Sequence, residues 1–473
     1  MHADGSERGG RGIAILGGGA AAFAAAIQAA EGGAAVTLIE AGTPGGTCVN
    51  TGCVPSKIMI RGAQLAHQQA HHPFQGVAKG APVIDRARMV AQQQERVAQL
   101  RHARYERRVA SDPRIALRRG RARFADAHTL KLTQPDGTEA TLAADRILIA
   151  TGRSPDVADT PGLSGTPFWT SEQALVTHEL PRHLIVYGAS AVGVELAQAF
   201  LRLGAGVTLI ARSTVLSRED PALGAALAAT LAAEGMRVLT HTTIRRVRHD
   251  RARFAVDLSR GEPLEGDRLL VATGRRPNTA GLGLESLGVK TANDGAIVVD
   301  SRLRTSIPHI YAAGDCTTLP QYVYVAAAAG RHAAINMLGG DAALDLSIVP
   351  AVTFTDPQVA TVGLSEATAK AQGLDAESRT LALDEIPRAL VNFETTGFVK
   401  LVAERRSGRL LGAQVFAPEA GEMIQSAALA LRAQMTVRDI ADQLFPYLTM
   451  VEGLKLCALA FFGDVKKLSC CAG

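Results

Sequence analysis

Residues 13–22 read IAILGGGAAA, and this short stretch decides the fold. Four apolar residues suited to a buried strand are followed by three glycines, and an alanine-rich run to about Glu31 then predicts a helix. A second apolar stretch, residues 35–40, predicts the next strand and ends on Glu40. The order strand, glycine turn, helix, strand is typical of a dinucleotide-binding unit.

The first glycine turn predicts a binding site for a pyrophosphate. Glycines allow close approach of the backbone to the phosphates, and a helix N-terminus favours an anion. Glu40, at the end of the second strand, can accept hydrogen bonds from ribose hydroxyls. The alternative is a tight turn that serves only helix–strand packing. The residues expected at the dinucleotide are Gly17, Gly19, Ala22 and Glu40.

The same pattern occurs a second time. Its strand, turn, helix and strand are expected over residues 183–187, 188–193, 194–203 and 207–211. Each unit is followed, at a distance, by a near-identical phrase, which is ATGRSP at 150–155 and ATGRRP at 272–277. The chain therefore contains an internal repeat of a whole nucleotide-binding domain.

The second turn differs from the first in the residues that follow it. Arg212 stands where the first unit has Glu40, and Arg218 is nearby. A carboxylate would repel a 2′-phosphate, whereas a guanidinium would bind it, which favours NADPH over NADH. The alternative is two ordinary surface arginines. The turn itself contributes Gly188, Ser190 and Gly193.

The remaining sequence bounds the class of protein. The chain has 473 residues, 47% hydrophobic and 20% charged, which is long enough for several globular domains. After about residue 346, segments 397–403 and 410–416 alternate like antiparallel strands, and helices are expected over 419–433 and 436–444. These segments predict a separate α+β domain.

Charge and hydropathy exclude two classes of partner. The formal net charge is +5, but the basic residues are scattered and form no block with interleaved aromatics, which disfavours nucleic-acid binding. No stretch approaches a membrane-spanning helix. We expect a soluble cytoplasmic protein without a nucleic-acid or membrane partner, and a disordered leader over residues 1–11.

The six cysteines are too few for a secreted disulfide framework. Cys48 and Cys53 lie in GGTCVNTGCVPSK at 45–57. At a helix start this spacing would put both sulfurs on one face, within reach of a disulfide, and the helix N-terminus would lower a thiolate pKa. A zinc half-site is the alternative, although it needs two more ligands.

The other cysteines divide into a pair and two single residues. Cys470 and Cys471 are adjacent near the end of the chain, where they could form a soft-metal hook or a shuttling dithiol. The alternative is an incidental terminal pair. Cys316 and Cys457 are expected to be buried small hydrophobic residues.

The cysteine segment, the two ATGRxP phrases and AAGD at 312–315 together resemble the pyridine nucleotide-disulfide oxidoreductases over nearly the whole chain. That family includes glutathione reductase, lipoamide dehydrogenase and mercuric reductase. The resemblance implies an α/β fold with two Rossmann-like dinucleotide-binding domains, for FAD and NADPH, plus a C-terminal α+β dimerisation domain. The implied boundaries are 1–154 for the FAD-binding domain, 155–275 for the NADPH-binding domain, 276–346 for the continued FAD-binding domain, and 347–473 for dimerisation and the Cys-Cys tail.

Two features make the chain similar to the mercuric reductases within this family. The family's H-P-T-x-x-E phrase, which carries a His–Glu dyad, reads YLTMVE here, so Tyr447 replaces the histidine and Glu452 is kept. A tyrosine with a pKa of about 10 is a poor base for an organic disulfide, whereas reduction of a metal does not need that base. The tail SCCAG and the phrase LFPYLTMVEG at 444–453 resemble those of mercuric reductases.

The resemblance implies that electrons from NADPH reach FAD, then the Cys48–Cys53 disulfide, and finally Hg(II). Cys53 would lie against the flavin, and Cys48 would be the exchanging thiol. Lys57 and Glu195 resemble the family's ion pair beside the flavin and nicotinamide. Tyr105 and Tyr447 match positions near the bound metal, although a solvent-facing place in a basic helix is an equal alternative for Tyr105.

Delivery of the metal would involve a second subunit. Cys470 and Cys471 would take Hg(II) from small thiols and pass it to Cys48 and Cys53 of the partner, which requires a homodimer with shared active sites. The resemblance also implies cofactor contacts at Gly42, Gly46, Thr47, Lys57, Ala122, Gly152, Gly274, Asp315 and Val323.

Three other functions stay open at this point. One is a large-type thioredoxin reductase, which also carries a C-terminal dithiol but keeps the dyad histidine. Another is an organic disulfide reductase with an unused tail. The last is a thiol-based metal-sequestering protein in which FAD is only structural.

Overall fold

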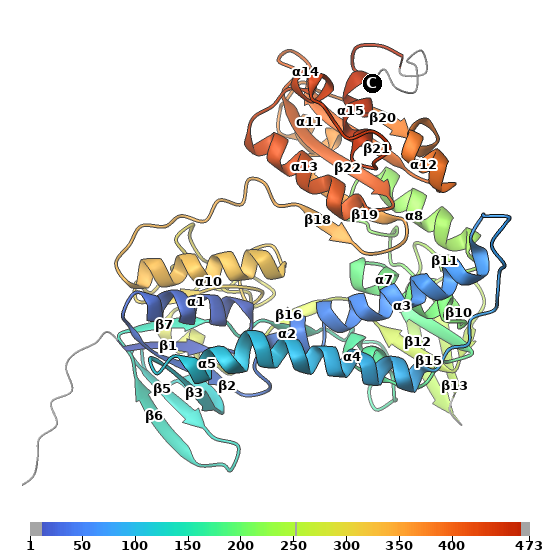
Figure 1. Ribbon diagram of the computed structural model, residues 1–473. Helices are drawn as coiled ribbons and strands as arrows, with labels where there is room; N and C mark the ends of the chain where they lie inside the picture. The colour runs from blue at the N-terminus through green and yellow to red at the C-terminus, as the bar shows by residue number, and fades with distance from the viewer. Residues whose placement is uncertain (1–11, 251–252, 465–473) are drawn as a thin grey trace, which may run out of the picture. The chain divides into compact units, whose positions relative to one another are not determined.

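The structure is a computed structural model that describes residues 12–250 and 253–464. The chain forms two compact units, each assembled from three segments (Figure 1). Unit 1 comprises residues 1–58, 88–157 and 274–345, and unit 2 comprises 59–87, 158–273 and 346–473. The predicted leader 1–11 and the pair Cys470 and Cys471 lie outside the described residues.

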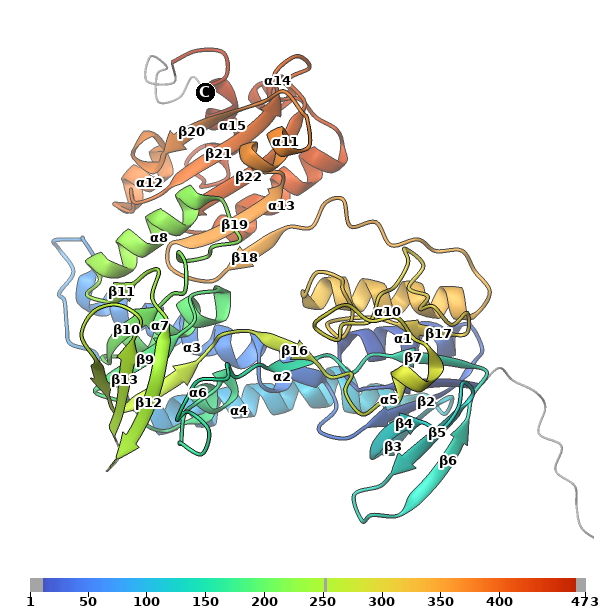
Figure 2. The ribbon, with the colours of Figure 1, turned by 180° about the vertical axis from the view of Figure 1, so that it is seen from behind.

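A five-stranded parallel sheet forms the centre of unit 1. Its strands are apolar runs because both faces of the sheet are covered. Helices α1 (Ala20–Glu31) and α10 (Val323–Met337) lie side by side on one face (Figures 1 and 2). In sheet order the strands are β17 (Ile310–Ala312), β7 (Arg146–Ile149), β1 (Gly12–Leu16), β2 (Ala35–Glu40) and β3 (Ile115–Arg119).

The helices on this face approach each other unusually closely. A Cβ atom added at Gly330 of α10 would lie 2.0 Å from the Ala21 carbonyl oxygen of α1. The alanine-rich composition of both helices therefore has a structural cause, because larger side chains would separate their backbones. Ala22, Ala25 and Ala29 are accordingly fully buried.

The second face of the sheet packs against a small antiparallel sheet through Leu16, Ile149, Leu130 and Leu132, among others. The described part of unit 1 also contains a two-stranded ribbon, three short helices and a π-helical turn at His102–Glu106. These elements are β4 (Arg121–Phe124), β5 (Thr129–Thr133), β6 (Glu139–Ala143), β8 (Arg153–Pro155), β16 (Arg275–Pro277), α2 (Gly46–Asn50), α5 (Arg107–Ser111) and α9 (Leu284–Leu287).

Two longer helices, α3 (Cys53–His71) and α4 (Arg86–Arg101), contain residues of both units.

Unit 2 repeats the architecture of unit 1 with a four-stranded parallel sheet. In sheet order its strands are β11 (Arg237–Leu239), β10 (Gly206–Ile210), β9 (His183–Tyr187) and β15 (Arg268–Val271). Its other elements here are α6 (Ser171–Val176), α7 (Ala191–Arg202), α8 (Pro221–Ala233), β12 (Ile244–Asp250), β13 (Arg253–Leu258) and β14 (Leu264–Gly266).

The C-terminal part of unit 2 is an antiparallel sheet covered by helices. Leu401, Val415 and Ile424 belong to its core. In sheet order the strands are β18 (Ala351–Thr353), β19 (Gln358–Gly363), β22 (Leu410–Ala417), β21 (Phe398–Glu404) and β20 (Ala376–Ala382). The helices are α11 (Glu366–Ala371), a 3-10 turn (Leu383–Glu385), α12 (Pro387–Asn392), α13 (Ala420–Arg432), α14 (Val437–Asp442) and α15 (Glu452–Leu459).

The fold class predicted from the sequence is confirmed. Two parallel-sheet units of the dinucleotide-binding kind are present, and an α+β region follows residue 346. The domain boundaries inferred from the resemblance stay a prediction. Cys316 and Cys457 are both fully buried, as expected. Across residues 12–250 and 253–464, no helix combines the length and the apolar character needed to cross a bilayer.

Candidate active site

The first glycine turn connects β1 to α1. Gly17 has a φ of +117°, and a Cβ atom there would lie 2.2 Å from the carbonyl oxygen of Ala150. Gly188, between β9 and α7, has the same φ, and its Cβ would lie 2.2 Å from the carbonyl oxygen of Ala272. The alanine that begins each ATGR phrase therefore touches the first glycine of its own turn, which explains why the turn and the phrase recur together.

The surroundings of the first turn fit a dinucleotide. No side chain caps the N-terminus of α1 at Gly19, so its backbone amides stay available for a phosphate. A Cβ at Gly46 would lie 2.6 Å from the Gly19 Cα, so the cysteine segment closes over the turn. The Glu40 carboxylate accepts a hydrogen bond from the Gly42 amide at 2.5 Å, and a Cβ at Gly18 would lie 2.7 Å from it. The carboxylate thus stands beside the turn, where a ribose would bind.

Other residues implied for FAD also belong to unit 1. Asp315 follows β17, and burial raises the pKa of its carboxyl, against the opposing charges of Arg275 and Arg153. Gly152 and Gly274 have φ values of +69° and +156°, and a Cβ on either would meet nothing within 4 Å. Open space at both positions leaves room for a ligand. Ala122 lies on β4, Val323 begins α10, Thr47 belongs to α2, and Lys57 belongs to the first turns of α3.

The two cysteines do not share one helix, so that expectation is corrected. α2 ends at Asn50, and Cys53 begins α3. A Cβ at Gly52 would lie 2.9 Å from the Thr47 carbonyl oxygen, so the chain at Gly52 turns back onto α2. Cys48 is half-buried and Cys53 is exposed, and no disulfide joins them.

The expected lowering of the thiolate pKa is also wrong for Cys48. A hydrogen bond with Cys53 and burial both raise the pKa of the Cys48 thiol, and the charge of Lys57 only partly opposes them. The physical reason is that Cys48 lies within a single helical turn, whereas the longer helix begins only at Cys53. The hydrogen bond between the two thiols suits a pair of cysteines that react with the same substrate.

Two residues that the sequence did not single out hold this segment in place. The Asn50 side-chain amide donates to the carbonyl oxygens of Pro44 and Gly46 at 3.0 Å each. Its side-chain oxygen accepts a hydrogen bond from Arg101 Nη1 at 3.2 Å. Arg101 is 51 residues away, so no short motif could have indicated the contact.

Tyr105 lies in the π-helical turn that follows Arg101. Its ring meets Phe23 of α1 edge-on, with ring centroids 4.8 Å apart, so it packs against the core instead of facing solvent. Burial raises the pKa of the Tyr105 hydroxyl, and the charges of Cys48 and Cys53 raise it further. Tyr105 is therefore a neutral phenol, close enough to both sulfurs for their charges to act on it. π-Helical turns are frequent at functional sites.

The second glycine turn, in unit 2, is tied to the loop that carries Arg212 and Arg218. The Leu216 amide donates to the Ala189 carbonyl oxygen at 2.9 Å, so the loop is held against the turn. Both arginines are exposed, as binding of a 2′-phosphate would require. Ser190 precedes α7 and makes no capping bond, and a Cβ at Gly193 would lie 1.9 Å from the Gly188 carbonyl oxygen.

Glu195 is buried in α7, where one carboxylate oxygen accepts the Phe354 amide at 2.8 Å. That bond joins α7 to the loop after β18. Lys57 belongs to unit 1 and Glu195 to unit 2. Their ion pair beside a flavin therefore stays a prediction.

Tyr447 and Glu452 occupy the two positions of the family's dyad. Tyr447 precedes α15, and Glu452 is its first residue. Tyr447 is 47% exposed, and Leu448 after it has a left-handed φ of +57°. Glu452 is only 6% exposed, and its Oε2 atom makes no hydrogen bond within the described part of the chain. Burial raises the pKa of this carboxyl, although a hydrogen bond from the Leu448 amide opposes the rise. Within the described residues, one oxygen of the Glu452 carboxyl therefore has a hydrogen-bond partner and the other has none.

This carboxyl makes stability depend on pH. Because its pKa is raised in the folded chain, Glu452 contributes its full stability below its ordinary pKa and loses it as the pH rises through the folded value. We expect the thermal midpoint of Glu452→Gln, measured relative to that of the parent, to increase by about 1–2 °C as the pH rises from about 4 to about 8. Scanning calorimetry across that range, with the exposed Glu422→Gln as control, measures it. A difference that does not change with pH would contradict the prediction.

Comparison with known proteins agrees with this geometry. Residues 11–330 match the family described as pyridine nucleotide-disulphide oxidoreductase, and residues 349–458 match its dimerisation domain. The chain is 58% identical to a mercuric reductase from Shigella flexneri, over 98% of this chain and 82% of that protein. It is 45% identical to one from Streptomyces lividans, over 98% of both chains.

A solved structure extends the likeness to three dimensions. The Cu(II) complex of the HOCl-induced flavoprotein disulfide reductase RclA from Escherichia coli superposes with a TM-score of 0.86 at 30% identity, covering 96% of this chain and 100% of that one. The paired glycine turns, the cysteine segment between them and the dimerisation domain agree with these matches. The chain belongs to the pyridine nucleotide-disulphide oxidoreductase family.

Proposed function

We propose that this chain reduces Hg(II) to Hg(0) with two electrons from NADPH, which reach Cys48 and Cys53 through bound FAD. The observation that carries the proposal is the contact between the cysteine segment and the first glycine turn. The Gly45 amide donates to the Gly18 carbonyl oxygen at 2.7 Å, and Gly46 meets Gly19. This contact supports a redox dithiol at the dinucleotide, and Tyr447 in place of a base supports a metal as the substrate.

The bound FAD would supply the relay between a hydride donor and a dithiol. The overall reaction is Hg(SR)2 + NADPH + H+ → Hg(0) + NADP+ + 2 RSH, in which NADPH is oxidised and mercury is reduced. Hg(II) is soft and prefers thiolate ligands, so it enters by thiol exchange. The Cys48 thiolate displaces one RS−, the Cys53 thiolate displaces the second, and the protons of both thiols leave on the released RS−.

The side chains around the sulfurs have separate tasks. Lys57 places a positive charge near Cys48, which favours the thiolate needed for exchange. Tyr105 stays neutral and can offer a weak oxygen ligand to the metal during transfer. Tyr447, which is 47% exposed, can do the same for a metal arriving from outside.

Delivery involves the rest of the assembly. The dimerisation domain over residues 349–458 supports a homodimer. We infer that Cys470 and Cys471 of one subunit take Hg(II) from small thiols and pass it to Cys48 and Cys53 of the other. We place the enzyme in the cytoplasm, where NADPH and reduced thiols are both available.

An assay of substrate range tests the function. NADPH oxidation by the purified FAD-loaded chain would be followed with Hg(II) in excess 2-mercaptoethanol, and separately with glutathione disulfide, lipoamide and thioredoxin. We expect turnover with Hg(II), and a loss on the order of 100-fold or more in Cys48→Ala because the exchanging thiol is gone. Cys457→Ala, which removes a buried thiol elsewhere, is the control. Fast turnover with a disulfide and none with Hg(II) would overturn the proposal.

A change of two arginines tests the choice of nucleotide. Arg212→Gln/Arg218→Gln removes both guanidiniums of the loop held by Leu216, so KM for NADPH should rise about tenfold while KM for NADH changes little. Steady-state kinetics with both nucleotides measure this selectivity. The control is Arg245→Gln/Arg246→Gln, which removes two exposed arginines of β12. An equal rise for both nucleotides would refute the assignment.

Mixed dimers test delivery between subunits. The tail variant Cys470→Ala/Cys471→Ala should turn over thiol-bound Hg(II) several-fold more slowly, about fivefold or more, while NADPH still reduces the flavin. A dimer of one tail-variant subunit and one Cys48→Ala subunit keeps one complete path if delivery crosses the interface. Its activity should therefore recover to about half that of the parent. If the mixed dimer stays as slow as the tail variant, delivery within one subunit is indicated.

A further inference from the structure

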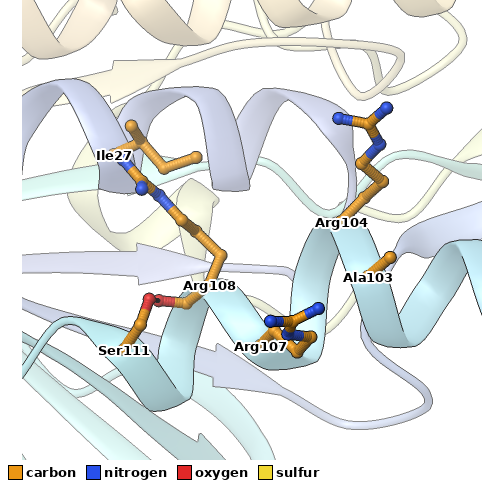
Figure 3. Close-up of a pocket in the computed structure, with 6 residues that line it drawn as sticks. All are labelled: Ile27, Ala103, Arg104, Arg107, Arg108 and Ser111. Carbon is orange, nitrogen blue, oxygen red and sulfur yellow. Dashed lines mark hydrogen bonds between the residues drawn. The ribbon is translucent and has the colours of Figure 1, made fainter.

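A surface hollow of ≈ 340 Å³ lies in unit 1 between α1 and the helical segment after α4. We call it the arginine hollow, because Arg104, Arg107 and Arg108 line it together with Ile27, Ala103 and Ser111. Figure 3 shows Arg108 reaching toward Ile27 on α1, with Arg104 extending from the same helical segment. The apolar side chain of Ile27 and three arginines from positions 104–108 therefore line the same hollow.

The charges of the arginine hollow are only partly compensated. Arg108 donates to Glu31 at 3.3 Å. Arg104 and Arg107 are exposed, and neither guanidinium makes an ion pair or a hydrogen bond to any residue that the structure describes. Like charges this close repel each other, so an anion in the arginine hollow would relieve the repulsion. Guanidinium groups bind carboxylates in particular, through two parallel hydrogen bonds.

A short chain of contacts links the arginine hollow to the cysteine segment. Ile27 follows Phe23 by four residues, so both side chains project from the same face of α1. Phe23 in turn meets the ring of Tyr105, at 4.8 Å between centroids. A Cβ at Gly45, three residues before Cys48, would lie 3.6 Å from the Tyr105 ring. Ile27 of the arginine hollow therefore lies one helical turn, about 5.4 Å along α1, from Phe23, whose ring contacts Tyr105.

We propose that the arginine hollow binds the carboxylates of the small thiol that carries Hg(II), so the preferred substrate is Hg(II) bound by a carboxylate-bearing thiol. The inference rests on the proposed function and names its substrate class. The arginine hollow serves the direct route to Cys48, which operates beside delivery by the tail and stays open in the tail variant. Its exchange is RS–Hg–SR + Cys48–S− → RS–Hg–S–Cys48 + RS−. Mercury stays Hg(II) in this step, and one Hg–S bond forms as another breaks. The proton that the Cys48 thiol loses before the attack is taken up by the released RS−, which leaves as RSH.

The test compares carriers of different charge. Hg(II) would be supplied to the FAD-loaded full chain in excess mercaptosuccinate, which bears carboxylates, or in excess 2-mercaptoethanol, which is neutral. The measured quantity is the ratio of kcat/KM for the two carriers. In Arg104→Gln/Arg107→Gln, which spares the Arg108–Glu31 pair, this ratio should fall about fivefold or more.

A matched control separates local from net charge. Arg245→Gln/Arg246→Gln lowers the net charge of the chain by the same amount, but its arginines lie on β12, and it should leave the ratio unchanged. Raising the ionic strength should lower the ratio of the parent, because salt screens exposed charges. A ratio unaltered in Arg104→Gln/Arg107→Gln overturns the inference, and so does an equal fall in the control.

A second measurement needs no variant. Methylthiosuccinate is a thioether with the same carboxylates, and it cannot replace a thiolate on Hg(II). It should inhibit turnover competitively with the mercaptosuccinate complex, and no inhibition would overturn the inference. Absence of any Hg(II)-dependent turnover with 2-mercaptoethanol would instead contradict the proposed function itself, so the two failures are distinguishable.

Discussion

The contact between a glycine at φ +117° and the carbonyl of a distant alanine organises both nucleotide-binding units. Because neither Gly17 nor Gly188 has a side chain, the end of the central strand can meet the ATGR phrase. The following helix then begins with uncapped amides at the carboxyl edge of the sheet, where ligands bind in open α/β sheets. The cysteine segment in unit 1 closes over this same edge through Gly46.

Much of this architecture could be predicted because it is local. The strands at 35–40 and 183–187 have the predicted bounds, since apolar runs between glycine turns leave little choice of register. Helix α7 begins at Ala191 instead of residue 194, because residues 191–193 were assigned to the glycine turn although they form the first turn of the helix. The residues of both glycine turns were identified for the same reason: their chemistry is contained in six consecutive positions.

What could not be predicted depends on contacts between distant segments. The break between α2 and α3 follows from packing at Gly52, not from helix propensity, since the stretch itself reads as one helix start. The Asn50–Arg101 bond joins residues far apart in the chain. Glu452 was identified from a phrase, but its half-satisfied carboxyl depends on the fold around it.

The π-helical turn at His102–Glu106 has a consequence for the evolution of this site. A π turn contains one residue more than the α-helix that it interrupts, and each residue rotates a helix by about 100°. Loss or gain of one residue here would rotate everything C-terminal to it about the helix axis relative to α1. Arg107 and Arg108 would then face a different neighbour, while Arg101 and its bond to Asn50 would stay in place. A single-codon deletion could therefore change which ligands the surface attracts without disturbing the cysteine segment.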